Sequence, residues 1–157
     1  MLFLLATPEY NNVQSNTTKV RVHLRTGIAE IFDQHQDLMG KVENNIVEVE
    51  TNFENRFEKF LFVLQDAVFI VSNQGFDTDS ENDDKQTSVY VYAKKVLEVN
   101  SKTSIDAITT EYEAKKSELE VELQKQGSEV SSSKILLLQE DTEFLKKSLS
   151  IIKGLKS

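Results

Sequence analysis

The chain has 157 residues, with 26 acidic against 18 basic side chains and a formal net charge of −8. This length suits one domain, or a small domain with an appendage, and the acidic balance argues against binding to nucleic acid, because phosphates attract basic surfaces. The lack of cysteine excludes disulfides, thiolate metal sites and a cysteine nucleophile, and the two histidines, His23 and His35, are too few for a multi-histidine metal site.

The first residues form an apolar run that is short for a targeting or membrane segment. Residues 1–6 are apolar, no basic residue precedes them, and the run is shorter than the core of a signal peptide. No stretch approaches the ~18 apolar residues of a membrane span. We therefore expect residues 2–7 to form a first β-strand, and we expect no direct insertion into a membrane.

Residues 1–99 carry the patterns of short β-strands. Basic side chains alternate with Val20, Val22 and Leu24, which predicts a strand with one buried and one solvated face. Runs that alternate in the same way, or are apolar on both faces, follow at 46–50, 57–64, 67–71 and 89–93. Many short strands at close spacing predict an antiparallel sandwich or barrel.

Two segments between these strands are predicted to be connections. Gln65 and Asp66 separate two apolar runs and predict a tight hairpin turn. Residues 72–88 are polar and acidic and predict a solvated loop. Its acidic side chains are spaced as at the start of a calcium loop, but the required glycine and distal glutamate are missing, so a calcium site is not expected; these positions are Asp77, Asp79, Glu81, Asn82 and Ser88.

Residues 100–157 carry helical periodicity instead. Thr103 and Asp106 resemble a capping box, and Gly127 and the serines at 128 and 131–133 predict a helix end followed by a new start. The first apolar stripe is interrupted by Lys115 and consists of Ile105, Ile108, Tyr112, Leu119 and Leu123. The second and wider stripe consists of Leu138, Leu145, Leu149 and Ile152. The predicted fold class is α+β: an N-terminal antiparallel β-sandwich or barrel over 1–99, then an antiparallel two-helix hairpin over 100–157.

The sequence contains no recognisable catalytic or phosphate-binding motif. His35 has acidic neighbours in Asp33 and Asp37, but a loop histidine of this kind is more often structural or solvated than catalytic. The basic row made by Lys19, Arg21, His23 and Arg25 is expected to be a solvated strand face, with contact to an acidic partner as the alternative. The chain is therefore expected not to be an enzyme and to need no cofactor.

Several motifs occur in an order that is typical of one family. An apolar strand leads into Thr7-Pro8-Glu9, and the run 27–39 matches the pattern G-E-L-G-I-aromatic-P-G-H-A-P-L-L without gaps at Gly27, Ile31, Phe32, His35 and Leu38. Residues 58–71 are similar to the family's E-E-F-x-x-V-x-x-G-x-x-E-V strand pair, and 89–91 to its V-x-V strand. With the β-rich first part and the helical hairpin, the chain resembles the epsilon subunit of F-type ATP synthases, called delta in mitochondria.

The resemblance implies a non-catalytic subunit in the central stalk of a rotary ATPase. Its expected partners are a gamma-like stalk subunit and, further, the catalytic alpha/beta hexamer and a rotor ring or a substitute for it. Its expected location is cytoplasmic and peripheral to the cell membrane, as part of the complex. The expected contact residues lie in the ring-facing loop and on the second helix; they are Phe32, His35, Leu38, Leu145, Leu149 and Ile152.

The sequence departs from the family pattern at two functional places. The loop 33–37 lacks the family's two prolines and its glycine, so we expect a changed loop shape. The family's ATP motif, I/L-D-x-x-R-A, keeps Asp106 but has Thr109 in place of arginine, which removes the guanidinium that would hold phosphate. ATP binding is therefore not expected.

Three alternatives to a conventional synthase subunit stay open. The chain could serve in an F-type-like ATPase that performs other mechanical work, such as gliding motility. It could be a β-sandwich adaptor, unrelated to any ATPase, whose hairpin binds a partner. An enzyme with a site that the sequence does not reveal ranks last.

Overall fold

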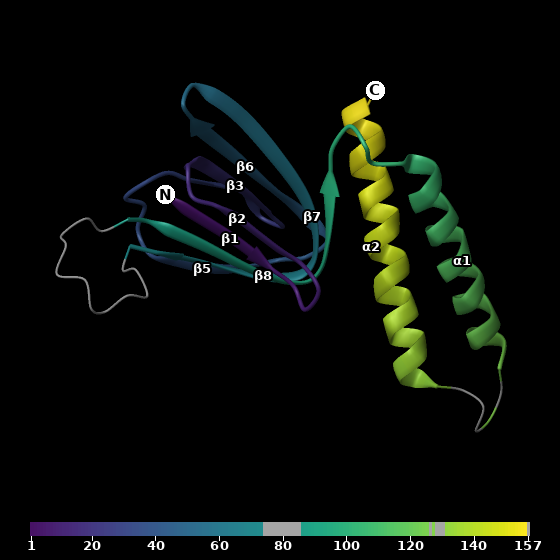
Figure 1. Ribbon diagram of the computed structural model, residues 1–157. Coiled ribbons are helices and arrows are strands. Elements are labelled where there is room, and N and C mark those ends of the chain that lie inside the picture. The colour runs from purple at the N-terminus through teal and green to yellow at the C-terminus, as the bar shows by residue number, and fades with distance from the viewer. Residues whose placement is uncertain (74–85, 126, 128–130, 157) are drawn as a thin grey trace. The chain divides into compact units, whose positions relative to one another are not determined.

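The computed structural model describes residues 1–73, 86–125, 127 and 131–156 and contains two compact units, Met1–Asn100 and Ser101–Ser157 (Figure 1). The described part of the first unit consists of strands and that of the second of two helices. The predicted fold class, an antiparallel β-sandwich followed by a helical hairpin, is confirmed. Of the positions compared with a calcium loop, only Ser88 lies within the described residues.

The strands of the first unit form one bent sheet whose layers enclose the core. They are β1 (Leu2–Ala6), β2 (Asn11–Gln14), β3 (Thr17–Leu24), β4 (Gly27–Ile31), β5 (Leu38–Val42), β6 (Asn45–Phe53), β7 (Arg56–Ser72) and β8 (Ser88–Val99). Their order is β2-β1-β8-β7-β6-β3-β4, and β5 pairs with β7 beside this path. The described pairs are antiparallel except β1 with β8, which run parallel.

The predicted hairpin turn at Gln65 and Asp66 is wrong, because β7 continues through both residues as a single strand of 17 residues. Asp66 has a φ of 45°, in the left-handed region that turn-forming residues tolerate. At this point β7 changes its partner on one edge, from β6, which ends its pairing at Leu64, to β5, which begins its pairing at Ala67. On the other edge of β7, β8 pairs with it in the same register before and after Asp66, so the local bend does not reverse the chain.

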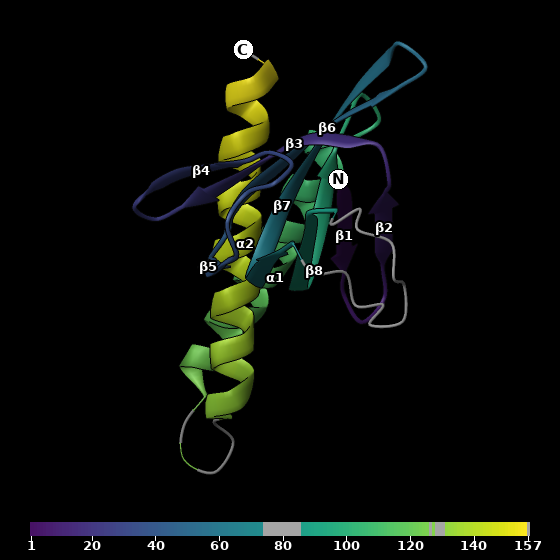
Figure 2. The same ribbon diagram turned by 90° about the vertical axis from the view of Figure 1, so that its left-hand side faces the viewer.

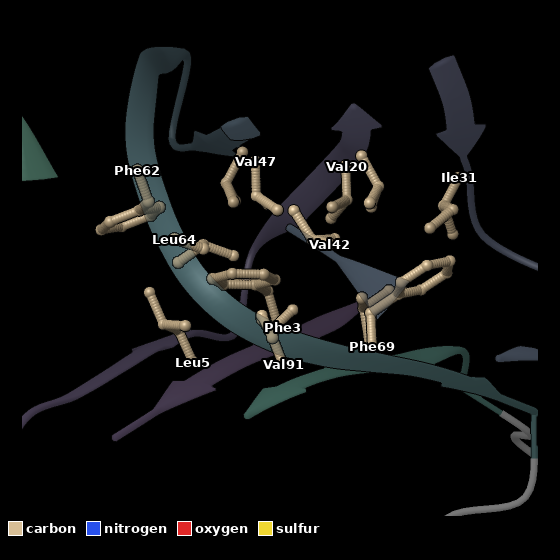
Figure 3. Close-up of a cluster of buried hydrophobic side chains, with 14 of the residues drawn as sticks. Phe3, Leu5, Val20, Ile31, Val42, Val47, Phe62, Leu64, Phe69 and Val91 are labelled. Carbon is tan, nitrogen blue, oxygen red and sulfur yellow. The ribbon is translucent and has the colours of Figure 1, made fainter. Parts of the chain in front are cut away.

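The core lies between the two layers that β7 connects. Figure 3 shows β7 curving around a cluster of inward-pointing side chains, labelled as Phe3, Leu5, Val20, Ile31, Val42, Val47, Phe62, Leu64, Phe69 and Val91. The rings of Phe3 and Phe62 stack with centroids 6.2 Å apart. Full burial of each such side chain contributes roughly 1.5–3 kcal/mol to folding, so this cluster fixes which face of every strand points inward.

Short strands at the edges of the sheet were missed by the sequence analysis. The unpredicted strands β2, β4 and β5 leave about half of their side chains exposed, so their apolar patterns are weak. The turn that joins β6 to β7 was also missed. It places Glu54 and Asn55 at φ values of 49° and 63°, as a two-residue hairpin turn requires, and it projects beyond the neighbouring strands (Figure 2).

The second unit consists of α1 (Ile105–Gln124) and α2 (Ser132–Lys156), which lie side by side (Figure 1). The predicted cap at Thr103 is wrong: the N-cap is Ser104, whose hydroxyl accepts a hydrogen bond from the Ala107 amide at 3.2 Å. The predicted serine cap of the second helix is confirmed at Ser131, whose hydroxyl accepts from the Lys134 amide at 3.3 Å. Serine favours this position because its side chain replaces the missing helical acceptor.

One position of the predicted first stripe is wrong. Leu123 is exposed, and the preceding residue, Glu122, is buried instead. Ile105, Ile108, Tyr112, Lys115, Leu119 and Glu122 are the partly or fully buried positions that repeat at spacings of three and four along α1. Hydrophobicity alone selects the leucine, whereas the helical spacing selects the glutamate.

The first prediction concerns Gly40 in β5, which pairs with Phe69. A Cβ atom at Gly40 would lie 2.6 Å from the Phe69 ring, which is buried in the core and has no room to withdraw. We expect Gly40→Ala to lower the free energy of unfolding by about 1–3 kcal/mol, measured by denaturant titration. In a Phe69→Leu background the cost should be smaller; an equal cost in both backgrounds would show that the ring is not the cause.

Candidate interaction surfaces

The loop between β4 and β5 is tied to the ends of β7 and β8 by a network of side chains. The amide of Gln34 donates to the Thr87 hydroxyl at 2.6 Å, and the amide of Thr87 donates to the Asp33 carboxylate at 3.3 Å. Thr87 in turn donates to the side chain of Asn73 at 2.6 Å, whose amide nitrogen contacts the His35 carbonyl. The Asn73 backbone amide donates to the Asp37 carboxylate at 3.0 Å. The loop is thus held without any proline.

The turn within this loop has left-handed backbone at Gln34, whose φ is 63°. This is the position at which the family pattern has glycine, so the sequence keeps a conformation that suits glycine while supplying a larger residue. Burial works against ionisation of Asp33, but hydrogen bonds from Thr87 and Gln34 outweigh it and lower the pKa of Asp33. The ionised carboxylate is therefore part of what stabilises the turn.

The structure brings the predicted loop contacts Phe32, His35 and Leu38 to one end of the sheet. Phe32 and Leu38 are exposed, and His35 is half-buried, with its ring nitrogen Nδ1 2.7 Å from the Gln36 carbonyl oxygen. Met39, which the sequence analysis did not select, is 71% exposed beside them. Apolar side chains presented on a fixed loop suit contact with another protein, and the role of these residues stays a prediction.

One outer face of the sandwich is apolar. In the register of the sheet, Met39 is paired with Ile70, Ile70 with Tyr90, Tyr90 with Leu4 and Leu4 with Val13. The next row pairs Val68 with Tyr92 and Tyr92 with Ala6, and it ends in polar residues, Lys41 beside Val68 and Asn11 beside Ala6. We call these eight residues the apolar outer face; they are Leu4, Ala6, Val13, Met39, Val68, Ile70, Tyr90 and Tyr92.

The apolar outer face crosses five strands, from β5 through β7, β8 and β1 to β2. Val13, Met39, Val68 and Tyr92 are exposed in it, whereas Tyr90 is buried, at 9% exposed, and Leu4, Ala6 and Ile70 are partly buried. Isolated exposed apolar residues are ordinary, but a contiguous apolar face marks a surface that another molecule covers. Sequence analysis could not find it, because its residues come from five separate segments that only strand pairing brings together.

A second outer face, formed by β4, β3, β6 and β7, is charged. Arg21 contacts Glu30 at 3.0 Å and Glu48 at 3.1 Å, and Lys19 contacts Glu50 at 3.2 Å. We call this the charged outer face; it consists of Lys19, Arg21, His23, Glu30, Glu48, Glu50 and Lys59. Three members of the basic row predicted from the sequence, Lys19, Arg21 and His23, therefore face acidic residues on neighbouring strands of the same sheet, which weakens the case for an acidic partner there.

Glu48 is the centre of the charged outer face. Its carboxylate lies 3.1–3.2 Å from side-chain nitrogens of Arg21, His23 and Lys59. Burial opposes ionisation of Glu48, but the hydrogen bonds from His23 and Lys59 and the charges of Lys59 and Arg21 outweigh it and lower its pKa. These groups satisfy one another and leave little net charge to attract a partner.

The remaining predicted site residues lie on the hairpin. Asp106 is exposed in the first turn of α1, and the hydroxyl of Thr109 donates to the Ile105 carbonyl at 2.8 Å, within its own helix. Leu145, Leu149 and Ile152 share one face of α2 and are buried in the chain, so their part in partner contacts stays a prediction. Across the described residues, no cluster of His, Asp and Glu side chains is suited to hold a metal ion.

Comparison with known proteins gives matches in structure but not in sequence. No protein-family model matches the chain, and no curated protein is similar to it in sequence. A chain in the Euglena gracilis mitochondrial ATP synthase, from a structure of OSCP, F1 and c-ring, matches with a TM-score of 0.60 and 10% identity, covering 96% of this chain and 79% of that one.

A second match spans this chain completely. It is a chain in the central stalk and c-ring structure of the Tetrahymena thermophila mitochondrial ATP synthase, with a TM-score of 0.50 and 9% identity, covering 100% of this chain and 96% of that one. At such identities the likeness establishes a shared fold, sandwich and hairpin together.

Neither described helix of this chain is long and apolar enough to cross a membrane.

The second prediction concerns Glu48. Its pKa is lower in the folded chain than the ordinary 4.5, so its stabilising contribution is complete above pH 4.5 and is lost as the pH falls through the folded pKa. Glu48→Gln should lower the free energy of unfolding by about 1–2 kcal/mol at neutral pH, and the gap to the native chain should be smaller at an acid pH below 4.5. Urea titrations at both pH values test this.

Glu50→Gln is the matched control for Glu48, because Glu50 is more exposed and forms an ion pair with Lys19, whereas Glu48 contacts three basic side chains. We expect a loss of less than about 1 kcal/mol for this variant. A Glu48→Gln gap that stays the same at both pH values would contradict the assignment of the carboxylate as the stabilising group.

The third prediction concerns nucleotide binding. Because Thr109 replaces the arginine of the family's ATP motif and bonds within its own helix, we expect the isolated chain to bind ATP weakly or not at all. Isothermal titration calorimetry measures this, and micromolar affinity would contradict it. Thr109→Arg, which restores the guanidinium, should bind more tightly than the native chain.

Proposed function

We propose that this chain is a non-catalytic central-stalk subunit of an F-type or F-type-like rotary ATPase, and that it binds a gamma-like subunit through the apolar outer face. The apolar outer face carries the proposal, because it aligns apolar side chains from five strands and leaves Val13, Met39, Val68 and Tyr92 exposed. The match of sandwich and hairpin to chains in two mitochondrial ATP synthase assemblies supplies the context. The complex would hold the chain at the periphery of the membrane.

The free energy gained when a partner covers the surface differs between the two outer faces. Covering the apolar outer face removes exposed aliphatic and aromatic area from water, and each exposed side chain that becomes buried can contribute roughly 1–3 kcal/mol. Covering the charged outer face would instead desolvate ion pairs that are already satisfied, which costs free energy. The apolar outer face is therefore the better docking surface.

The proposed role is mechanical. Strands β7 and β8 pair over most of their length and belong to both layers, so a load applied at the apolar outer face is transmitted through continuous backbone hydrogen bonds. The same strands hold the loop at Phe32, His35 and Leu38 through Asn73 and Thr87. This arrangement would couple the gamma-like subunit to a rotor ring, or a substitute, at the end of the sandwich.

The fourth prediction tests the docking face with a matched pair of variants. Val13 on β2 lies in the apolar outer face and is 55% exposed; Ile28 on β4 is paired with His23 on the opposite outer face and is 50% exposed. Val13→Asp should reduce recovery of a gamma-like subunit at least tenfold in affinity purification, since about 1.4 kcal/mol corresponds to tenfold. Ile28→Asp should recover it as the native chain does.

The outcome separates the proposal from its alternatives. Both variants should keep the native unfolding transition, because each side chain is exposed. Recovery of gamma-like, alpha-like and beta-like subunits with a motility apparatus would support the specialised ATPase. Recovery of no ATPase subunit by the native chain would refute the stalk role and leave the adaptor.

A further inference from the structure

A buried carboxylate lies at the connected end of the helical hairpin. Glu122 belongs to the last turn of α1 and is 2% exposed, whereas its neighbours Val121 and Leu123 are 60% and 56% exposed. The helix therefore turns a charged side chain inward and two aliphatic side chains outward, the reverse of what hydrophobicity favours. Such an inversion needs compensating contacts around the charge.

The contacts of Glu122 come from both helices. Its Oε2 atom lies 3.0 Å from Lys125 Nζ and 3.5 Å from Lys134 Nζ, and its Oε1 accepts a hydrogen bond from the Ser131 amide at 3.4 Å. Lys125 is the C-cap of α1, whereas Ser131 caps the start of α2. One carboxylate thus joins the end of one helix to the beginning of the next.

The carboxylate is well matched to this place. The amide end of a helix carries a partial positive charge, so an anion near Ser131 also interacts favourably with the dipole of α2. The hydrogen bond from Lys125, helped by Ser131 and Lys134 and opposed by burial, lowers the pKa of Glu122 and keeps it ionised at neutral pH.

The apolar contact between the helices is thin at this end of α1. Two of the inward positions of α1, Lys115 and Glu122, carry charged side chains. Apolar packing alone would therefore not prevent the two helices from sliding along each other or moving apart. The contacts of Glu122 with Ser131 and Lys134 join the two helices where they are connected, so splaying the helices at this end would break them. Fixing one register against others is the best-attested use of a buried polar group.

We infer that Glu122 is a clamp that fixes α1 and α2 in one closed hairpin geometry, so that the hairpin acts as a single preformed arm. This inference concerns the hairpin alone and does not depend on the proposed partner. It assigns a role to the one acidic residue among the inward-facing positions of α1, where simple core filling would favour leucine.

The absence of cysteine allows a direct test in the full chain, with spin labels at two introduced cysteines. Glu118→Cys and Gln139→Cys place labels at exposed positions of α1 and α2, and pulsed electron paramagnetic resonance measures the distance distribution between them. The test variants are Glu122→Leu, which fills the buried position with an aliphatic group, and Glu122→Gln, which keeps its size. Glu120→Leu, at an exposed carboxylate of the same turn, is the matched control.

The clamp predicts one narrow distribution for the native chain and for Glu120→Leu, and loss of that single narrow distribution in Glu122→Leu. Amide exchange over residues 135–142 should become about tenfold faster, as expected when charged hydrogen bonds are lost. Thermal stability is not the criterion, because replacing a buried charge by an apolar group is often neutral or stabilising.

A Glu122→Leu distribution as narrow as the native one would overturn the inference and leave Glu122 as a core position that leucine fills equally well. If circular dichroism shows that Glu122→Leu has lost helix, the isosteric Glu122→Gln decides. Gln cannot form ion pairs with Lys125 and Lys134, so the clamp predicts widening, and a native width in this variant would equally overturn the inference.

Discussion

The continuity of β7 is the constraint on which the rest of the sandwich depends. A chain that turned back at Gln65 and Asp66 would give two short strands and separate layers. Instead, pairing with β8 holds the register on both sides of Asp66, and the exchange of β6 for β5 on the other edge creates the second layer. The inward side chains then converge on one core (Figure 3), and the outward ones sort into two faces.

The two outer faces of this sheet differ in chemistry: one carries ion pairs, and the other carries apolar side chains. On the charged outer face, each strand contributes charges that its neighbours neutralise, with Glu48 serving three basic side chains. Such a surface stays in water because desolvating satisfied ion pairs costs free energy. On the apolar outer face, the same pairing geometry aligns aliphatic and aromatic side chains, with no charged residue between Met39 and Val13 along the row. We therefore expect association on the side of the apolar outer face.

The helical hairpin, like the charged outer face, contains a carboxylate surrounded by basic side chains. Two helices alone bury little apolar area. In α1, two of the inward positions carry the charged residues Lys115 and Glu122, which reduces this area further. The ion pairs and hydrogen bond of Glu122 offset this by acting at the connection, where a small angular error would move the far ends of the helices most. In both units, a carboxylate with little exposure is surrounded by basic side chains, and apolar packing supplies most of the stability.

The sequence by itself determined the fold class and the main elements, because the period of two around Val20 and Val22 and the helical stripe through Leu138 and Leu145 are local signals. It also pointed to Phe32, His35 and Leu38 as neighbours in one loop. Only the tertiary structure decided that Asp66 bends a strand instead of ending it, because pairing with β8 overrides local turn preference. Helical spacing points to Glu122 as an inward position, but only the structure shows the contacts with Lys125, Ser131 and Lys134 that compensate its charge. It also decided that residues from five strands form one apolar face, since strand adjacency is not written in a local pattern.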